Sequence, residues 1–282
     1  MKTIKRVLAP TDFSPIANNA LLYAIELAKE IGAKVYVLHS YRVPAIADTA
    51  YPIGGMYPEG MVDIEDVRKE VGEEMEKLKK DYLYSQSLQY ETLLKCGFAE
   101  ESIVDTVKNE HIDLIVMGTS GTNAIQEFLG STTTHIIKQC AVPTLVIPDG
   151  INFGKLESIV LATDYQQVHK PESYAALLFM ANIFHAEVDV LHVSKGGARL
   201  TEAELEAGEE LDRILRKTRH NYHYDFEEDS INKGIEKFLA KHKPSMLAMI
   251  PRKHSFWDKL LHGSKTQHMI FHTKRPVLIL KD

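Results

Sequence analysis

Three glycines and a serine in this chain have the spacing of a loop that holds an anion. Gly118 and Gly121 follow an apolar run, and glycine permits both positive φ and close approach of the backbone to a ligand. Gly130 and Ser131 directly precede an apolar stretch that we predict as a helix. The free N–H groups at the start of a helix attract anions, and Ser131 can cap the helix and donate to a phosphate oxygen.

An acidic side chain follows an earlier apolar run, where Asp12 comes after Thr11. In an open parallel sheet, ligands bind beyond the carboxyl ends of the strands, where the strand order reverses. Asp12 after the first strand and Gly118 after the fourth would both face that crevice. Each feature alone is a weak signal, because ordinary turns also use glycine and serine. Together on one edge of a sheet they predict a ligand that contains phosphate.

The chain repeats itself, because residues 249–270 are an imperfect copy of residues 117–137. The strand that ends at Thr163-Asp164 copies the strand that ends at Thr11-Asp12, and each half closes on a Pro-led apolar run. Landmarks that recur in the same order indicate a duplicated domain. We expect domain 1 at residues 1–149 and domain 2 at residues 150–282.

The second copy lacks the glycines of the first. Aligned on Gly263-Ser264, Pro251 and His254 stand at the positions of Gly118 and Gly121. Proline fixes φ near −65° and has no N–H, and histidine disfavours positive φ. One interpretation is that Arg252, Lys253 and His254 bind another anion, such as a phosphate or a phospholipid headgroup. We favour the other, in which Asp164 and Gly263-Ser264 are remnants of a decayed site kept for packing and dimerisation.

The remaining elements alternate between strands and helices. Ser14 is a good N-cap before Pro15, and Gly32 ends the helix that follows. The strand at 113–117 is apolar without alternation, as parallel strands covered on both faces are. The predicted fold class is α/β, with two tandem doubly wound, open, parallel five-stranded sheets, helices on both faces and a pseudo-twofold relation between the Rossmann-like halves.

Two further segments carry open alternatives. The Pro- and Gly-rich segment 43–62 is either a lid or partner contact at the edge of the crevice, or an irregular insertion. His268 and His272 have i, i+4 spacing with His262 nearby, which would suit a metal. No Cys or acidic residue completes that site, and His135 corresponds to His268 in the repeat, so we expect no metal there.

Composition narrows the classes of partner. The chain has 282 residues, a formal net charge of −6 and two cysteines. The negative charge without a basic cluster argues against nucleic acid or an anionic membrane as the main partner, and too few cysteines exist for a disulfide framework. No run is long and apolar enough for a membrane span. We expect a cytoplasmic protein.

The motifs described above resemble those of a tandem universal stress protein, a family of the adenine-nucleotide alpha hydrolase-like fold. The matching segments are VLAPTDFS at 7–14, VYVLHS at 35–40, DLIVMGTSG at 113–121, LGSTTTHII at 129–137 and VPTLVIP at 142–148. The second half matches at VLATD, VDVLH, HGS and RPVLIL and poorly between them.

The resemblance implies an ATP site in domain 1, with Mg²⁺ carried by the nucleotide. Asp12 would bond the adenine, and the base would lie beside Pro10, Thr11 and the backbone of Ser40 and Met117. Segments 113–121 and 129–137 align with the family's phosphate loop. The ribose and phosphates would therefore contact Gly118, Gly121, Gly130, Ser131 and Thr132. The family usually has nine residues between the second and third glycines, whereas this chain has the eight residues 122–129. The shorter loop either absorbs the deletion or moves Gly130-Ser131 away from the γ-phosphate.

The catalytic motifs of related folds are absent. The sequence has no SGGxDS pyrophosphatase loop, no HIGH adenylylation motif and no Walker loop. We therefore expect a stress-response binding module with at most slow ATP hydrolysis. Resemblance also implies that the two halves pair through their last strands, at 142–147 and 277–280, with a homodimer and an unknown signalling protein as further partners. The alternatives are an interaction protein that binds no nucleotide and a carrier of a small ligand or lipid in domain 2.

Overall fold

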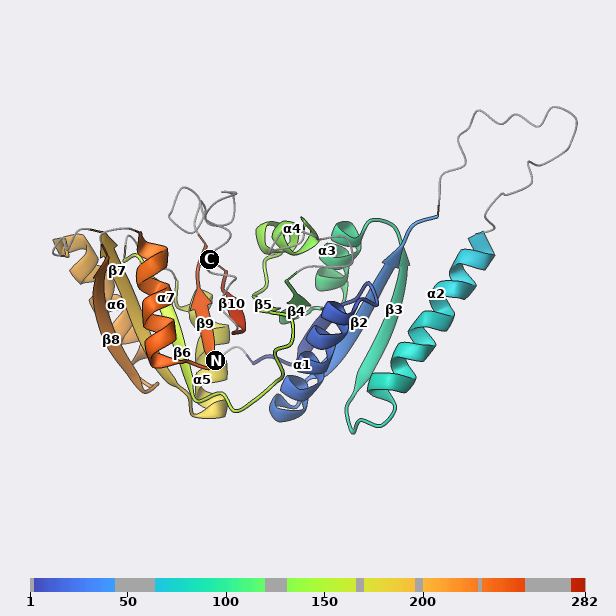
Figure 1. Cartoon of the computed structure of the whole chain (residues 1–282), viewed down its shortest axis with the longest axis horizontal. Coiled ribbons are helices and arrows are strands. Elements are labelled where there is room, and N and C mark those ends of the chain that lie inside the picture. The colour runs from blue at the N-terminus through green and yellow to red at the C-terminus, as the bar shows by residue number, and fades with distance from the viewer. Residues whose placement is uncertain are drawn as a thin grey trace, which may run out of the picture.

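All the described strands form one sheet of ten. The computed structural model describes residues 3–43, 64–119, 131–165, 170–195, 200–227, 230–251 and 275–281. The strand order is β3-β2-β1-β4-β5-β10-β9-β6-β7-β8. Figure 1 shows the sheet running from β8 at one end of the molecule, through β5 and β10, to β3 at the other. The fold is thus α/β with a mixed, mostly parallel sheet.

The first half, up to residue 149, contributes the strand order β3-β2-β1-β4-β5, and all of its strand pairs are parallel. The order reverses between β1 and β4, which places the switch point between the strands that carry Asp12 and Gly118. The elements are β1 (Arg6–Pro10), α1 (Pro15–Ile31), β2 (Lys34–Tyr41), α2 (Ile64–Leu78), a π-helical turn (Lys79–Leu83), β3 (Tyr90–Cys96), α3 (Ala99–Asn109), β4 (Leu114–Gly118), α4 (Ser131–Gln139) and β5 (Thr144–Ile147).

The second half repeats this order as β8-β7-β6-β9-β10, again with parallel pairs. Its first helix begins with a 3₁₀ turn at Pro171–Tyr174. The other elements are β6 (Ser158–Thr163), α5 (Ala175–Phe184), β7 (Glu187–Lys195), α6 (Glu202–Leu215), β8 (His220–Glu227), α7 (Ile231–His242), β9 (Met246–Met249) and β10 (Val277–Ile279).

The two halves meet through their last strands, as predicted. β10 runs antiparallel to β5, with Val277 opposite Val146 and Ile279 opposite Thr144. This pairing corrects the expectation of two separate five-stranded sheets, because the backbone hydrogen bonds continue across the seam. Each last strand would otherwise leave a row of unpaired backbone groups at a sheet edge, and pairing the two removes both edges.

Helices cover both faces of the sheet. On one face, α1, α2, α5 and α6 share a single apolar core that reaches from Ile4 to Leu280. On the other face, α3 and α4 pack over β1 and β4 of the first half, and α7 packs over the second half. Ile137 of α4 belongs to the core of the second half. The seam is therefore packed by side chains as well as joined by strands.

Local sequence explains where α1 begins and ends. Ser14 has extended backbone geometry, and its hydroxyl accepts the N–H of Ala17 at 3.1 Å, while Pro15 occupies the first turn. Gly32 ends the helix with φ of 67°, in the left-handed region that glycine tolerates. Ser14 and Pro15 therefore fix the start of α1 directly behind Asp12, and Gly32 fixes its end.

Candidate functional site

The turn between β1 and α1 is held by its own side chains. The Thr11 hydroxyl accepts the N–H of Phe13 at 3.0 Å, and the Asp12 carboxylate accepts the N–H of Ser14 at 3.1 Å. The Thr11 N–H donates to Leu38 O at 2.8 Å, which ties the turn to β2. Phe13 has φ of 61°. Thr11 is buried and Asp12 is exposed, so the turn presents the carboxylate to solvent at the carboxyl edge of the sheet.

The sequence did not single out a histidine that braces this turn. His39 Nδ1 donates to Thr11 O at 2.8 Å, and its ring centroid lies 4.3 Å from that of Phe13. The signal was present, because both halves carry Val-Leu-His at the end of their second strand. Ser40 follows His39 in β2, where it pairs with Lys95 of β3. Pro10 and Ser40 are both partly exposed near the ends of their strands.

The end of β4 lies against the start of α1. Met117 is buried. A Cβ built on Gly118 would lie 2.6 Å from Ile16 Cγ2 and 3.2 Å from Ile16 O. Gly118 does not have a positive φ, unlike Gly32, Gly97 and Gly150 among the described glycines. The expectation of a left-handed backbone at Gly118 is therefore wrong, and the observed need for glycine is the close approach of β4 to α1.

The start of α4 returns to the same strand end. The Thr133 hydroxyl donates to Gly118 O at 3.1 Å, so the first turn of α4 lies beside the end of β4. The described part of α4 starts at Ser131, and the expected role of Ser131 as the N-cap stays a prediction. Gly121 and Gly130 lie outside the described residues. The structure thus brings the start of α4 to the switch point of the first half.

An acidic residue lies at the start of α4. The Thr132 hydroxyl donates to Glu100 Oε1 at 3.1 Å, and Glu100 stands in the first turn of α3. Close to this edge, the Arg42 guanidinium lies 5.1 Å from the centre of the Phe98 ring. Phe98 precedes α3 and is 54% exposed. Sequence patterns gave no reason to choose these residues, because only the fold brings Glu100 to the start of α4 and Phe98 to Arg42.

The second half repeats the turn with one changed ring. His192 Nδ1 donates to Thr163 O at 3.1 Å, and the N–H of Tyr165 donates to the Thr163 hydroxyl at 3.2 Å. Tyr165, at the position of Phe13, has φ of 50° and is only 2% exposed. Its ring stacks on His192 at 5.0 Å, and burial raises the pKa of its hydroxyl. The two halves therefore share the scaffold of the turn that bears Asp12 and Asp164.

Several predicted features fall outside the described part of the chain. These are Arg252, Lys253, His254, Gly263-Ser264, the histidines 262, 268 and 272, and all but Val43 of the segment 43–62. Within the described ranges, no group of three or more His, Cys, Asp or Glu side chains could hold a metal ion. Among the helices that the structure describes, none combines the length and the apolar character that a bilayer crossing requires.

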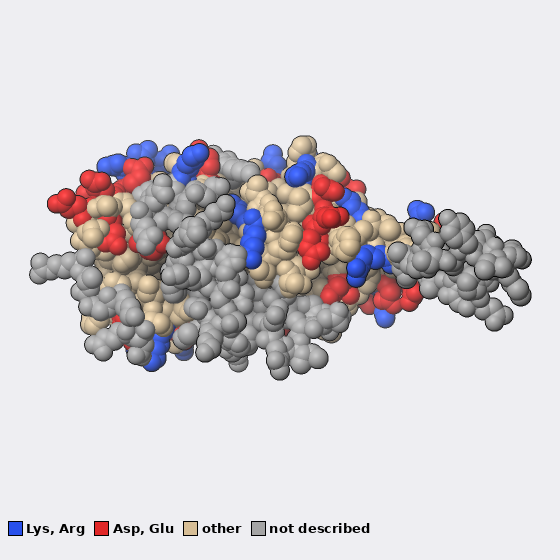
Figure 2. All heavy atoms as spheres, turned by 90° about the horizontal axis from the view of Figure 1, so that it is seen from above, with Lys and Arg blue, Asp and Glu red and all other residues tan. Residues whose placement is uncertain are grey.

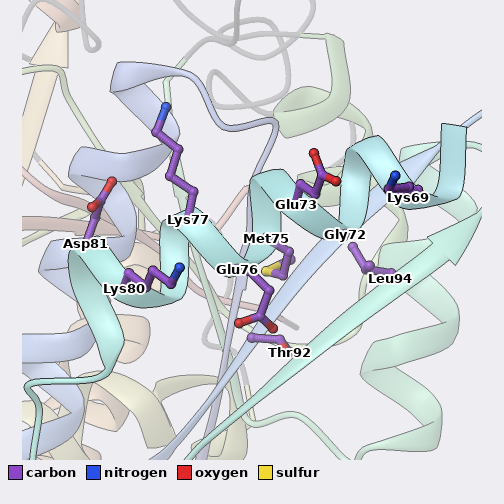
Figure 3. A pocket seen from close by; sticks show the side chains of 10 residues that line it. All are labelled: Lys69, Gly72, Glu73, Met75, Glu76, Lys77, Lys80, Asp81, Thr92 and Leu94. Carbon is purple, nitrogen blue, oxygen red and sulfur yellow. The ribbon is translucent and has the colours of Figure 1, made fainter. Parts of the chain in front are cut away.

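A separate open groove lies at the edge of the sheet, between α2 and β3. Its volume is about 720 Å³, and Figure 3 shows Thr92 and Leu94 of β3 opposite side chains of α2 such as Met75. Both lysines and acidic residues line it, and none of the predicted site residues does. Figure 2 likewise shows lysine, arginine and acidic residues interspersed over the face that it presents. We assign no ligand to this groove.

The first half of the chain matches a known protein family. The model of the Universal stress protein family matches residues 3–148. Universal stress protein MJ0531 of Methanocaldococcus jannaschii is 32% identical over 145 residues, which are 51% of this chain and 81% of that protein. Universal stress protein YxiE of Bacillus subtilis is 29% identical over 147 residues, which are 50% of this chain and 97% of that protein.

Solved structures resemble the whole chain. A universal stress protein from Archaeoglobus fulgidus covers 99% of this chain and 97% of its own, with a TM-score of 0.66 and 18% identity. Protein PA1789 of Pseudomonas aeruginosa, described as functionally unknown, covers 99% of this chain and 92% of its own, with a TM-score of 0.57 and 14% identity. At these identities the likeness concerns the fold, and it extends over both halves.

Proposed function

The chain belongs to the universal stress protein family, and on that premise we propose that its first half is a domain that binds one adenine nucleotide, ATP with Mg²⁺. Some members of the family bind nucleotides, and one universal stress protein has been solved in complex with cAMP. For this chain the proposal rests on its own residues at the switch point between β1 and β4. Binding, without a catalytic role, is the function that we assign.

The contact that carries the proposal is the hydrogen bond from Thr133 to Gly118 O. This bond joins the start of α4 to the end of β4, which lies beside the turn that holds Asp12. At the start of a helix the N–H groups and the helix dipole favour an anion. A base near Asp12, Ser40 and Met117 and phosphates near Ser131 would then occupy one continuous edge. We therefore expect the shorter loop between Gly121 and Gly130 to keep Ser131 within reach of the phosphates.

Glu100 supports a role for Mg²⁺ in this proposal. Its carboxylate accepts the Thr132 hydroxyl at 3.1 Å, so an acid would stand beside the phosphates. Like charges at that separation repel, and a Mg²⁺ ion that bridges phosphate oxygens would reduce the repulsion. We expect tighter ATP binding with Mg²⁺ than without it, and a smaller effect of Mg²⁺ in Glu100→Gln.

For the second half we propose the role of a pairing partner with a degenerate site. Its β10 completes the sheet beside β5, and its turn keeps Thr163 and Asp164. Pro251 lies two residues beyond the end of β9, at the position of Gly118 in the repeat, and proline supplies no N–H to a ligand. The proposal therefore predicts one nucleotide per chain.

The duplication supplies a matched control for the binding test. ATP with Mg²⁺ is titrated calorimetrically into the full chain, Asp12→Asn and Asp164→Asn. Loss of a hydrogen bond to a charged group costs about 1.5–3 kcal/mol, so we expect about 10- to 100-fold weaker binding in Asp12→Asn. Asp164→Asn should bind one ATP with unchanged affinity.

Two results would contradict the proposal. Equal affinity of the parent and Asp12→Asn would remove Asp12 from the site, and two nucleotides per chain would contradict the degenerate second half. Circular dichroism of both variants shows whether the fold is retained. A parent that binds no nucleotide would favour the alternative suggested by the β5–β10 pairing, a protein that acts through association alone.

A further inference from the structure

The strand β8 forms one end of the sheet of described strands (Figure 1). Within the described part of the chain its one strand partner is β7, which it pairs with in parallel along all of His220–Glu227. Val188 of β7 lies opposite His220, and its N–H donates to Arg219 O at 2.9 Å. In such a ladder, alternate residues of a strand direct both backbone groups to the same neighbour. The residues of β8 that direct their N–H and C=O to the outer edge are therefore Tyr222, Tyr224 and Phe226.

Large aromatic side chains are exposed on this edge strand. Tyr224 is 54% exposed and Phe226 is 69% exposed, the highest value among the large hydrophobic residues that the structure describes. Soluble proteins commonly protect an edge strand with lysine, proline or a β-bulge. β8 contains no lysine or proline, and its register with β7 continues without a bulge. The strand is therefore suited to pair with a further strand.

We propose that β8 is a dimerisation surface, where it pairs antiparallel with β8 of a second copy of this chain about a twofold axis at Tyr224. A twofold axis places the residue beside it opposite its own copy. This register pairs every residue of β8 except His220. An axis at Tyr222 or at Phe226 would pair a shorter part of the strand. With the axis at Tyr224, about six backbone hydrogen bonds join the two copies.

The side chains of β8 complement one another in this register. On one face the rings of Tyr222 and Tyr224 stack 6.5 Å apart. Tyr224 lies opposite its own copy there, and Tyr222 lies opposite Phe226 of the second copy, and aromatic pairs across strands are stabilising. On the other face the Asp225 carboxylate lies opposite the His223 imidazole of the second copy. The same short segment supplies both sides of every contact, which favours a second copy over an unrelated partner.

The second half holds this surface in place before any partner binds. The Tyr224 ring lies 6.1 Å from that of Tyr165 in the buried turn after β6. The Asp212 carboxylate of α6 bonds His220 Nε2 at 3.0 Å and accepts the Tyr222 hydroxyl at 3.5 Å. A surface that is already ordered loses little conformational entropy when it associates. Pairing of β8 therefore requires no rearrangement of the contacts that position it.

The first test measures the oligomeric state of the full chain by sedimentation velocity at protein concentrations from about 1 to about 100 µM. We expect a monomer–dimer equilibrium in the parent. Phe226→Lys should weaken the dimer by about tenfold or more, because it removes the aromatic pair and places a charge at the edge in both copies. The matched control is Leu94→Lys in β3, at the opposite end of the sheet, where Leu94 is 38% exposed. This variant should dimerise like the parent, and circular dichroism shows that both variants keep the fold.

The second test examines the register with a cysteine at the twofold axis. Cys96→Ser first removes the exposed thiol of β3. In that background Tyr224→Cys should form a disulfide between two chains on mild oxidation. Directly opposite residues of an antiparallel pair have Cα atoms about 4.5–5.5 Å apart, and disulfides span that distance. The matched control is Thr92→Cys in β3, which should run as a monomer on a non-reducing gel.

A parent that stays monomeric at about 100 µM would overturn the proposal. A dimer that Phe226→Lys leaves intact, or one that Leu94→Lys weakens, would also overturn it, and the second result would assign the contact to β3. Assemblies larger than a dimer that both lysine variants dissociate would show pairing of β8 with β3 and would contradict the twofold contact. A disulfide in Thr92→Cys without one in Tyr224→Cys would refute the register and the surface together.

Discussion

The buried amine of Lys281 predicts a specific dependence of stability on pH. Its pKa in the folded protein is about 8, below the usual 10.5. Between these values the unfolded chain binds more protons at this residue than the folded chain does, so the free energy of unfolding rises with pH. Below pH 8 both states are protonated, and the folded state retains the full cost of burying the ammonium.

The magnitude follows from the difference between the two pKa values. A decrease from 10.5 to about 8 corresponds to about 3 kcal/mol if the difference is fully expressed. Lys281 keeps some contact with solvent, so we expect about 1–3 kcal/mol. Lys281→Met removes the titrating group with little change in volume. The parent should therefore gain about 1–3 kcal/mol relative to Lys281→Met between pH 7 and pH 10.

The assay is urea denaturation of both proteins at pH 7, 8, 9 and 10, followed by circular dichroism. Buried tyrosines such as Tyr23 and Tyr165 have raised pKa values and lower the stability of both proteins above pH 10, where the unfolded chain ionises first. That effect cancels in the difference between the two proteins. A difference that stays constant from pH 7 to pH 10 would refute the assignment of Lys281 as a buried amine with a lowered pKa.

Three further predictions concern the fold. Gly118→Ala should destabilise the chain by about 1–3 kcal/mol, because its Cβ would lie 2.6 Å from Ile16 Cγ2. The control is Gly72→Ala, because Gly72 lies in α2 and a Cβ there would have no atom near it. Gly72→Ala should increase the free energy of unfolding by about 0.5–1 kcal/mol. Urea denaturation measures both variants. Ser14→Ala should cost about 1 kcal/mol through the lost cap of α1, and no change in the denaturation midpoint would count against the cap. Leu278→Ala, fully buried in β10, should cost about 2–5 kcal/mol, and a smaller loss would mean that the seam is not tightly packed.

The sequence predicted the elements well where a local signal marks their ends. Ser14, Pro15 and Gly32 define α1 because capping and left-handed termination depend on the residues at the ends themselves. The helix α2 (Ile64–Leu78) continues directly into a π-helical turn at 79–83. A π turn adds one residue to the hydrogen-bonded ring, and apolar spacing over so short a stretch does not distinguish it from an α-helix.

Contacts between distant segments could not be predicted in the same way. Gly118 was expected to serve a ligand through close approach of the backbone and positive φ, whereas its visible constraint is the side chain and carbonyl of Ile16. Both explanations require glycine, so residue type alone cannot separate them. The hydrogen bond of His39 to Thr11 O and that of Thr132 to Glu100 depend on which strands and helices become neighbours. Their residues carry no periodic pattern.

The two halves also differ where each last strand ends. In the repeat, Pro276 corresponds to Pro143, so Lys281 stands at the position of Pro148. The Pro148 carbonyl accepts a hydrogen bond from Asn19 of α1, within its own half. Lys281 reaches into the other half and donates to Ile137. A proline has no donor to make that contact, so exchanging Lys281 for proline would break the link from the second half to α4 and leave the equivalent position of the first half untouched. The duplication thus preserves the turn at Asp12 and Asp164, while one hydrogen bond across the seam comes from a residue that only one copy has.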